Sequence, residues 1–378
     1  MSIKIQDNVF TLTTDETQYQ FRADKFGILS HLWYGPVTDE NMSYLQDYPD
    51  VGFSGQIFDA EGDRTYSMDT KLLEYPGWGV GDYRIYAASV REPSGADVLD
   101  LRYDSYELID GTVELEGLPH VRPCDEAQTL KIIMKDVTKT TQVNLYYTVL
   151  PREDAIVRWA EFVNIGKEDI TLLSAASASL DFYPEKLDLI HFHGGYCKER
   201  NFERVPIMHG VHDVFSLRGE SSAQHNPAVI VAQRHTSEGR GYCWGIMFMY
   251  SGNFSIRTER DQLNQIRVVI GINPNHFSWL LKPGETFTTP QALFSMSRQG
   301  FTKLTHNLHN LINRHITEPQ FRNVPRSILI NNWEATYFTF DGQKNLHIAK
   351  KASNLGIEMM VLDDGWVGKR DKDTEGLG

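Results

Sequence analysis

Short runs of β-branched and aromatic residues alternate with polar residues along most of the chain. Residues 9–13, 18–21, 143–149 and 156–163 are typical runs, and this alternation indicates strands with one buried face. Turn-forming sequences such as Lys282-Pro283-Gly284-Glu285 separate the runs. Many short strands at this spacing predict a mainly β protein with a large antiparallel sandwich.

The pattern changes near residue 300. Mostly apolar residues recur there at three- and four-residue steps, which predicts a helix with one buried stripe. The stripe consists of Phe301, Leu304, Leu308, Leu311, Ile312 and His315. Pro319 and Pro325 follow the stripe and should end the helix.

A strand–helix–strand pattern follows. Residues 327–330 and 357–362 are continuous apolar runs, as expected for strands buried on both faces. Between them Asp341 is placed to cap a helix that Gly356 would end. The inner stripe of this helix would be Leu346, Ala349, Ala352 and Leu355. We therefore predict that a parallel α/β domain begins near residue 326. Two strands and one helix leave half a core, so we expect this domain to be incomplete at Gly378.

Composition narrows the possible partners. The 378 residues include 37 Lys+Arg and 50 Asp+Glu, for a formal net charge of −13. This acidic balance argues against nucleic acid and against an anionic membrane surface. No apolar stretch reaches the roughly 20 residues of a membrane span. The N-terminus lacks a signal-like apolar segment, and the three cysteines are few and widely spaced, so we expect a cytoplasmic protein.

Two polar clusters follow the predicted parallel strands, where functional groups gather in such folds. They are Asn331-Asn332-Trp333-Glu334 and Asp363-Asp364-Gly365-Trp366. Trp offers a flat apolar face to a sugar ring, and carboxylates accept strong hydrogen bonds from hydroxyls. Neighbouring carboxylates arise from Cα atoms ~3.8 Å apart, so they suit two hydroxyls of one sugar better than the two sides of a scissile bond. A polar turn that merely ends the strand is the alternative.

Four histidines have a spacing that resembles metal ligands. They are His191, His193, His209 and His212. No carboxylate or cysteine completes a known ligand pattern, so we expect no metal and interpret them as hydrogen-bonded loop histidines. The glycine-rich residues 77–82 lack a strand-to-helix context, and we do not expect them to bind phosphate.

Residues 330–338 and 361–366, which contain the two polar clusters, resemble the opening strands of glycoside hydrolase family 36 α-galactosidases of the large bacterial tetrameric type. Residues 63–70, 221–227, 251–254 and 271–274 match the same family in order. The resemblance covers essentially the whole chain. It implies an N-terminal β-supersandwich at 1–298, a linking helix at 299–325, and the first two strands of a (β/α)8 TIM barrel at 326–378, with the barrel truncated in this chain.

The resemblance also implies an activity and a set of binding residues. The activity is retaining hydrolysis of terminal α-1,6-linked galactose, as in melibiose and raffinose, by a homotetramer that needs no cofactor. Asp363 and Asp364 would bind galactose hydroxyls, and Trp333 would stack near the sugar. The sandwich domain would contribute its own residues, partly across the tetramer interface; these are Asp50, Tyr196 and Arg64.

No catalytic residue is expected within the chain. The family's nucleophile and its acid/base Asp belong to later motifs that do not occur here, so both would lie beyond Gly378 and the chain alone should be inactive. Two alternatives remain open: a sugar-binding or oligomerisation module without chemistry, and a galactosyl transferase of the same superfamily.

Overall fold

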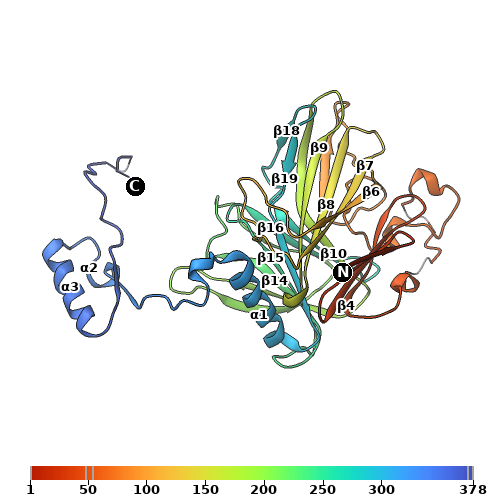
Figure 1. The fold of residues 1–378 in the computed structure, drawn as a ribbon. Helices are drawn as coiled ribbons and strands as arrows, with labels where there is room; N and C mark the ends of the chain where they lie inside the picture. Colours follow the sequence, from red (N-terminus) through yellow and green to blue (C-terminus); the bar gives the residue numbers. More distant parts are fainter. Residues whose placement is uncertain (1, 47–48, 53–54, 373, 377–378) are drawn as a thin grey trace. The chain divides into compact units, whose positions relative to one another are not determined.

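The computed structural model describes residues 2–46, 49–52, 55–372 and 374–376. The chain divides into two compact units, Met1–Thr317 and Glu318–Gly378. The first unit contains three antiparallel sheets and one long helix, and the second contains a small parallel sheet with its own helices (Figure 1).

The N-terminal sheet has the strand order β1-β2-β3-β4. Its strands are β1 (Ile3–Gln6), β2 (Val9–Thr13), β3 (Thr17–Ala23) and β4 (Leu29–Pro36). The short helices η1 (Met42–Leu45), η2 (Phe58–Ala60) and η3 (Met68–Thr70) follow in the long connection to the next strand.

The ten-stranded sheet has the order β12-β11-β14-β15-β20-β9-β8-β7-β6, and β19 also pairs with β9. Its strands are β6 (Leu101–Asp110), β7 (Gln128–Asp136), β8 (Thr141–Leu150), β9 (Ala155–Asn164), β11 (Leu187–His193), β12 (Asn201–Pro206), β14 (His225–Gln233), β15 (Cys243–Phe248), β19 (Thr286–Thr288) and β20 (Ala292–Ser297). The turn η4 (Pro151–Glu153) joins β8 to β9.

The six-stranded sheet has the order β13-β16-β17-β10-β18, and β5 also pairs with β10. Its strands are β5 (Ala88–Arg91), β10 (Ile170–Phe182), β13 (Gly210–Phe215), β16 (Phe254–Arg260), β17 (Ile266–Ile272) and β18 (Trp279–Leu281).

One apolar core joins the three sheets. Phe21, Leu145 and Ile270, one from each sheet, belong to a single buried cluster. Phe21 stacks on Phe10 with ring centroids 4.9 Å apart and on Tyr147 of β8 at 5.0 Å. The strands predicted at 9–13, 18–21, 143–149 and 156–163 all lie within β2, β3, β8 and β9, so the prediction of a mainly β sandwich is confirmed.

The predicted helix near residue 300 belongs to the first unit. Helix α1 (Gly300–Leu311) continues into a π-helical turn, η5 (Ile312–Ile316), and packs on β15 and β20. Leu304 is buried with Cys243 of β15. A Cβ at Gly245 would meet Leu304 and Leu308 at 3.1–3.4 Å, so glycine allows the helix to lie close to the strand. Among the described residues, no helix has the length and apolar character needed to cross a membrane.

The second unit is the predicted strand–helix–strand element. After the turn η6 (Pro319–Phe321), β21 (Leu329–Asn331) pairs in parallel with β22 (Met359–Val361). Helices α2 (Trp333–Thr336) and α3 (Gly342–Asn354) lie between them in sequence. Asp341 caps α3 by accepting a 2.8 Å bond from the Lys344 amide, and Gly356 follows the helix with φ +83°.

The prediction that these apolar strands and the helix stripe are buried is wrong in this structure. Leu346 and Leu355 of the stripe are 53% and 81% exposed, and Leu329 and Met359 of the strands are 51% and 46% exposed. Ala352 alone of the four stripe residues is fully buried. The reason is geometric, because two strands and one helix cannot cover both faces of a sheet.

Candidate functional site

The carboxylate of Asp363 is held at the end of β22 by its neighbours on β21. The Asn331 side chain donates a 2.6 Å hydrogen bond to Asp363 Oδ2, and the Asp364 amide donates a 2.8 Å bond to Oδ1. These two bonds, that from Asn331 first, lower the pKa of the Asp363 carboxyl below its usual value. The group is therefore a charged acceptor at neutral pH, as a hydroxyl-binding carboxylate must be.

Asn332 is a buried support for this turn. It is fully buried, and its Oδ1 accepts a 2.9 Å bond from the backbone N–H of Asp363. Its Nδ2 reaches Thr336 Oγ1 at 3.3 Å. Because Asn332 also donates its backbone N–H to the Val361 carbonyl at 3.2 Å, one residue joins the ends of both parallel strands.

An aromatic group lies beside the carboxylates. Trp333 is half-buried and meets Phe338 and Tyr337 edge-on, with ring centroids 4.9 and 5.3 Å apart. Trp366 is 61% exposed on the turn after Asp364. The C-terminal end of this small sheet thus offers charged acceptors and exposed ring faces, the combination that suits a neutral polyol with C–H faces.

Asp50 and Arg64, predicted from different parts of the first unit, form an ion pair. Arg64 Nη2 lies 3.0 Å from Asp50 Oδ1, and the side chains are 64% and 51% exposed. The same oxygen of Asp50 accepts a 3.0 Å bond from the Gly52 amide. The pair presents one anionic and one cationic group to solvent. The carboxylate can accept hydrogen bonds from hydroxyls, and the guanidinium can donate hydrogen bonds to them.

Tyr196 lies on the loop between β11 and β12 and is 77% exposed. A tight turn holds the loop, since the Lys198 amide donates to the Gly195 carbonyl at 2.9 Å. A Cβ at Gly194 would come within 2.3 Å of the Lys198 carbonyl oxygen, so only glycine permits the turn. The loop therefore carries the exposed Tyr196 on a tight turn.

Three of the four histidines lie on strands, so their interpretation as loop residues is wrong. His191 and His193 belong to β11, and His212 belongs to β13 of the other sheet. The ring of His191 lies 5.0 Å from that of His212 and 6.0 Å from that of His193. Among the described residues, no group of three or more His, Cys, Asp or Glu is arranged to hold a metal ion.

The structure assembles the predicted residues in part. It joins Asp363 and Asp364 at one turn with Trp333 nearby, and it pairs Asp50 with Arg64. Sequence reasoning missed the supporting roles of Asn331 and Asn332. The available signal was an amide directly after an apolar strand, where its side chain can reach the neighbouring strand end.

Known proteins match this chain along nearly its whole length. Residues 27–282 match the glycosyl hydrolase family 36 N-terminal domain, and residues 286–378 match the melibiase family. The bifunctional alpha-galactosidase/sucrose kinase AgaSK of Mediterraneibacter gnavus is 44% identical over 98% of this chain and 40% of its own length. Alpha-galactosidase AgaA of Geobacillus stearothermophilus is 39% identical over 99% of this chain and 51% of its own length.

Solved structures agree with this relationship. The galactosidase domain of AgaSK superposes with a TM-score of 0.95, covering 98% of this chain and 52% of that structure. A variant of AgaA crystallised with raffinose superposes with a TM-score of 0.91 at 39% identity, covering 97% and 51%. The chain thus spans about half the length of the relatives it matches. On this evidence the chain belongs to glycosyl hydrolase family 36.

Proposed function

We propose that this chain is the N-terminal portion of an α-galactosidase that releases terminal α-1,6-linked galactose with retention of configuration. The observation that carries the proposal is the Asp363–Asp364 turn, held by Asn331 and Asn332, in a chain that is 44% identical to an α-galactosidase over 98% of its length. In this proposal the two carboxylates bind galactose hydroxyls, and Trp333 packs near the sugar ring.

Exposed apolar surface supports a longer protein. Leu329, Leu346, Leu355 and Met359 of the second unit are 46–81% exposed, and apolar faces of a βαβ element are normally covered by further strands and helices. We propose that the remainder of a (β/α)8 barrel covers them and supplies the nucleophile and the acid/base residue beyond Gly378. The 378-residue chain would then bind no substrate productively and would release no galactose.

Oligosaccharides of the raffinose series are the proposed substrates. Structures of AgaA variants contain raffinose and stachyose, and this chain matches AgaA along nearly its whole length. We propose a cytoplasmic homotetramer as the active form. The exposure of Tyr196, Asp50 and Arg64 leaves them accessible to a sugar pocket shared between subunits.

The anomer released by the full-length protein tests the proposal. Melibiose hydrolysis followed by proton NMR should show α-galactose first, with the β-anomer appearing later by mutarotation. The 378-residue chain should release no galactose from melibiose or from an aryl α-galactoside. Initial β-galactose would exclude retention, and galactosyl oligosaccharides as the main product would favour the transferase. Turnover by the 378-residue chain would show that the catalytic groups lie within it.

A further inference from the structure

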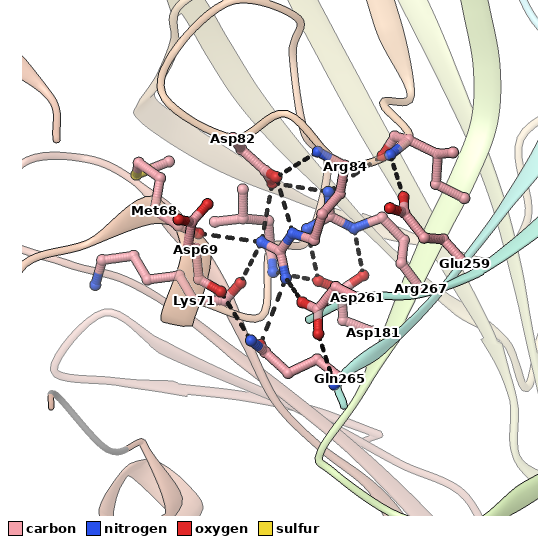
Figure 2. A network of polar contacts seen from close by, with 12 residues as sticks. Met68, Asp69, Lys71, Asp82, Arg84, Asp181, Glu259, Asp261, Gln265 and Arg267 are labelled. Carbon is pink, nitrogen blue, oxygen red and sulfur yellow. Dashed lines mark hydrogen bonds and ion pairs between the residues drawn. The ribbon is translucent and has the colours of Figure 1, made fainter. Parts of the chain in front are cut away.

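A buried ionic network joins the segment around residues 68–84 to strands β10 and β17 (Figure 2). Its central members are Asp82, Arg84, Asp181 and Arg267, each 6% exposed or less. Arg267 of β17 donates to both oxygens of Asp181 at 2.7 and 2.8 Å and to Asp82 Oδ2 at 2.7 Å. Arg84 donates from Nε to Asp82 Oδ1 at 2.8 Å. Asp261 is a third buried anion, with its Oδ2 3.4 Å from Arg84 Nη1, so two cations and three anions are paired in the interior.

The network holds the backbone of the segment that follows Arg64. Arg84 Nη2 donates to the carbonyl of Met68, the first residue of η3, at 3.1 Å and to that of Lys71, the residue after η3, at 2.7 Å. The Gln265 side chain donates to the Asp69 carbonyl at 2.8 Å. This segment is not part of a sheet, so side chains replace the partners that a neighbouring strand would provide.

Asp82 is a fixed anion within the network. Burial by itself raises the pKa of the Asp82 carboxyl, but Arg267 and Arg84 outweigh burial and lower it to about 2. Asp82 therefore remains an anion through the physiological pH range. In some proteins buried polar groups specify one arrangement of the chain, and we interpret this network in that way.

Gly55 and Gln56 are tied to the same segment. The Met68 amide donates to the Gly55 carbonyl at 2.9 Å, and the Gln56 side chain donates to the Asp63 carbonyl. A Cβ at Gly55 would lie 2.4 Å from the carbonyl oxygen of Gly81, so Gly55 packs directly against the residue before Asp82. The loops around residues 55, 68 and 82 therefore behave as one packed cluster on the network.

We propose that Arg84 is a positioning residue for the Asp50–Arg64 pair, acting through the backbone of residues 66–71. This inference rests on the proposed function, in which that pair binds the galactoside. Arg84 does not contact substrate. It fixes the carbonyls of Met68 and Lys71, four and seven positions after Arg64, and so restrains the chain that leads back to the exposed pair before the sugar binds.

The test is an Arg84→Lys variant of the full-length enzyme, assayed with an aryl α-galactoside. Lysine keeps the charge but cannot bond two carbonyls and Asp82 together. We expect KM to rise roughly tenfold while kcat changes less than about threefold. Arg91→Lys is the matched control, because Arg91 makes a similar two-bond pair with Asp97 on an exposed surface. Its kinetic constants should equal those of wild type.

A double variant separates positioning from general destabilisation. In an Arg64→Ala background, Arg84→Lys should raise KM less than twofold further, because the residue that it positions is gone. An undiminished rise in that background would overturn the inference, as would an unchanged KM in Arg84→Lys alone. If Arg64→Ala and Asp50→Asn leave KM unchanged, the proposed role of the pair fails instead. Gln265→Ala removes the bond to the Asp69 carbonyl and the 3.4 Å bond from Arg84 Nη1 to Gln265 Oε1. It replaces Arg84→Lys if that variant does not fold, with an expected KM rise of about threefold.

Discussion

Removing the charge of Arg158 should destabilise the first unit strongly. Arg158 of β9 lies 2.6 Å from Glu74 Oε1, and neither side chain is more than 3% exposed. Glu74 also accepts bonds from the hydroxyls of Tyr19 at 2.7 Å and Tyr147 at 2.8 Å. An Arg158→Met substitution keeps much of the side-chain length but leaves the Glu74 carboxylate buried without its cation.

Breaking a buried pair in this way costs about 3–5 kcal/mol of unfolding free energy. Urea unfolding at pH 7, followed by far-ultraviolet circular dichroism, measures the loss. Arg152→Met is the control, because Arg152 and its partner Glu126 are 62% and 53% exposed, and an exposed pair contributes less than about 1 kcal/mol.

The dependence of this loss on pH has a definite sign. Burial is the largest influence and raises the pKa of Glu74, but Arg158, His31 and Tyr19 together outweigh burial, so the pKa lies below its usual value in the wild-type fold. Without Arg158 the burial effect remains, and the folded variant binds a proton at a higher pH than the unfolded chain. The deficit should therefore shrink as the pH falls from 7 toward 5. A loss equal to that of Arg152→Met, or one independent of pH, would refute the reasoning.

Three further predictions concern other parts of the chain. Asn331→Ala should raise the pKa of Asp363 toward its ordinary value, because the amide bond to Oδ2 is lost; carbon-detected NMR titration measures the shift, and an unchanged pKa would contradict it. Burial and neighbouring histidines lower the pKa of both His191 and His225, so stability should fall as the pH drops below about 6.5. A His191→Gln/His225→Gln double variant should flatten this slope in urea unfolding, and an unchanged slope would exclude the histidines. Leu346→Lys should be tolerated in the 378-residue chain, where Leu346 is 53% exposed, but should lower the stability of the full-length protein by about 2 kcal/mol or more; equal effects in both would show that no further chain covers this face.

Local patterns were sufficient to predict most elements. Alternation identified β2, whose burial alternates, whereas β-branched and aromatic residues identified β9, which is buried over most of its length. Asp341 and Gly356 marked the ends of α3 because capping and positive φ need those residue types. The same logic failed for the burial of Leu346, since a periodic stripe indicates which face is apolar and not whether anything covers it.

Long-range ion pairs could not be predicted. Arg158 interrupts an apolar strand pattern, yet nothing in the sequence connects it with Glu74, which is 84 positions away. Arg267 is 185 positions from its partner Asp82. Its charge and that of Arg84 resemble those of surface residues in the sequence, although the fold buries both. The carboxylates of Asp363 and Asp364 were accessible to sequence reasoning because a strand end constrains them locally.

The most direct test of the account is the effect of the two strand-end carboxylates on galactoside turnover by the full-length protein. Asp363→Asn and Asp364→Asn should each lower kcat/KM by roughly 100-fold, as expected when a charged ligand of a sugar hydroxyl is lost. Asp371→Asn is the control, because Asp371 is 63% exposed and pairs only nearby with Lys369 at 3.2 Å; it should behave like wild type. If Asp363→Asn and Asp364→Asn match this control in an active enzyme, the turn does not bind galactose and the central claim is contradicted.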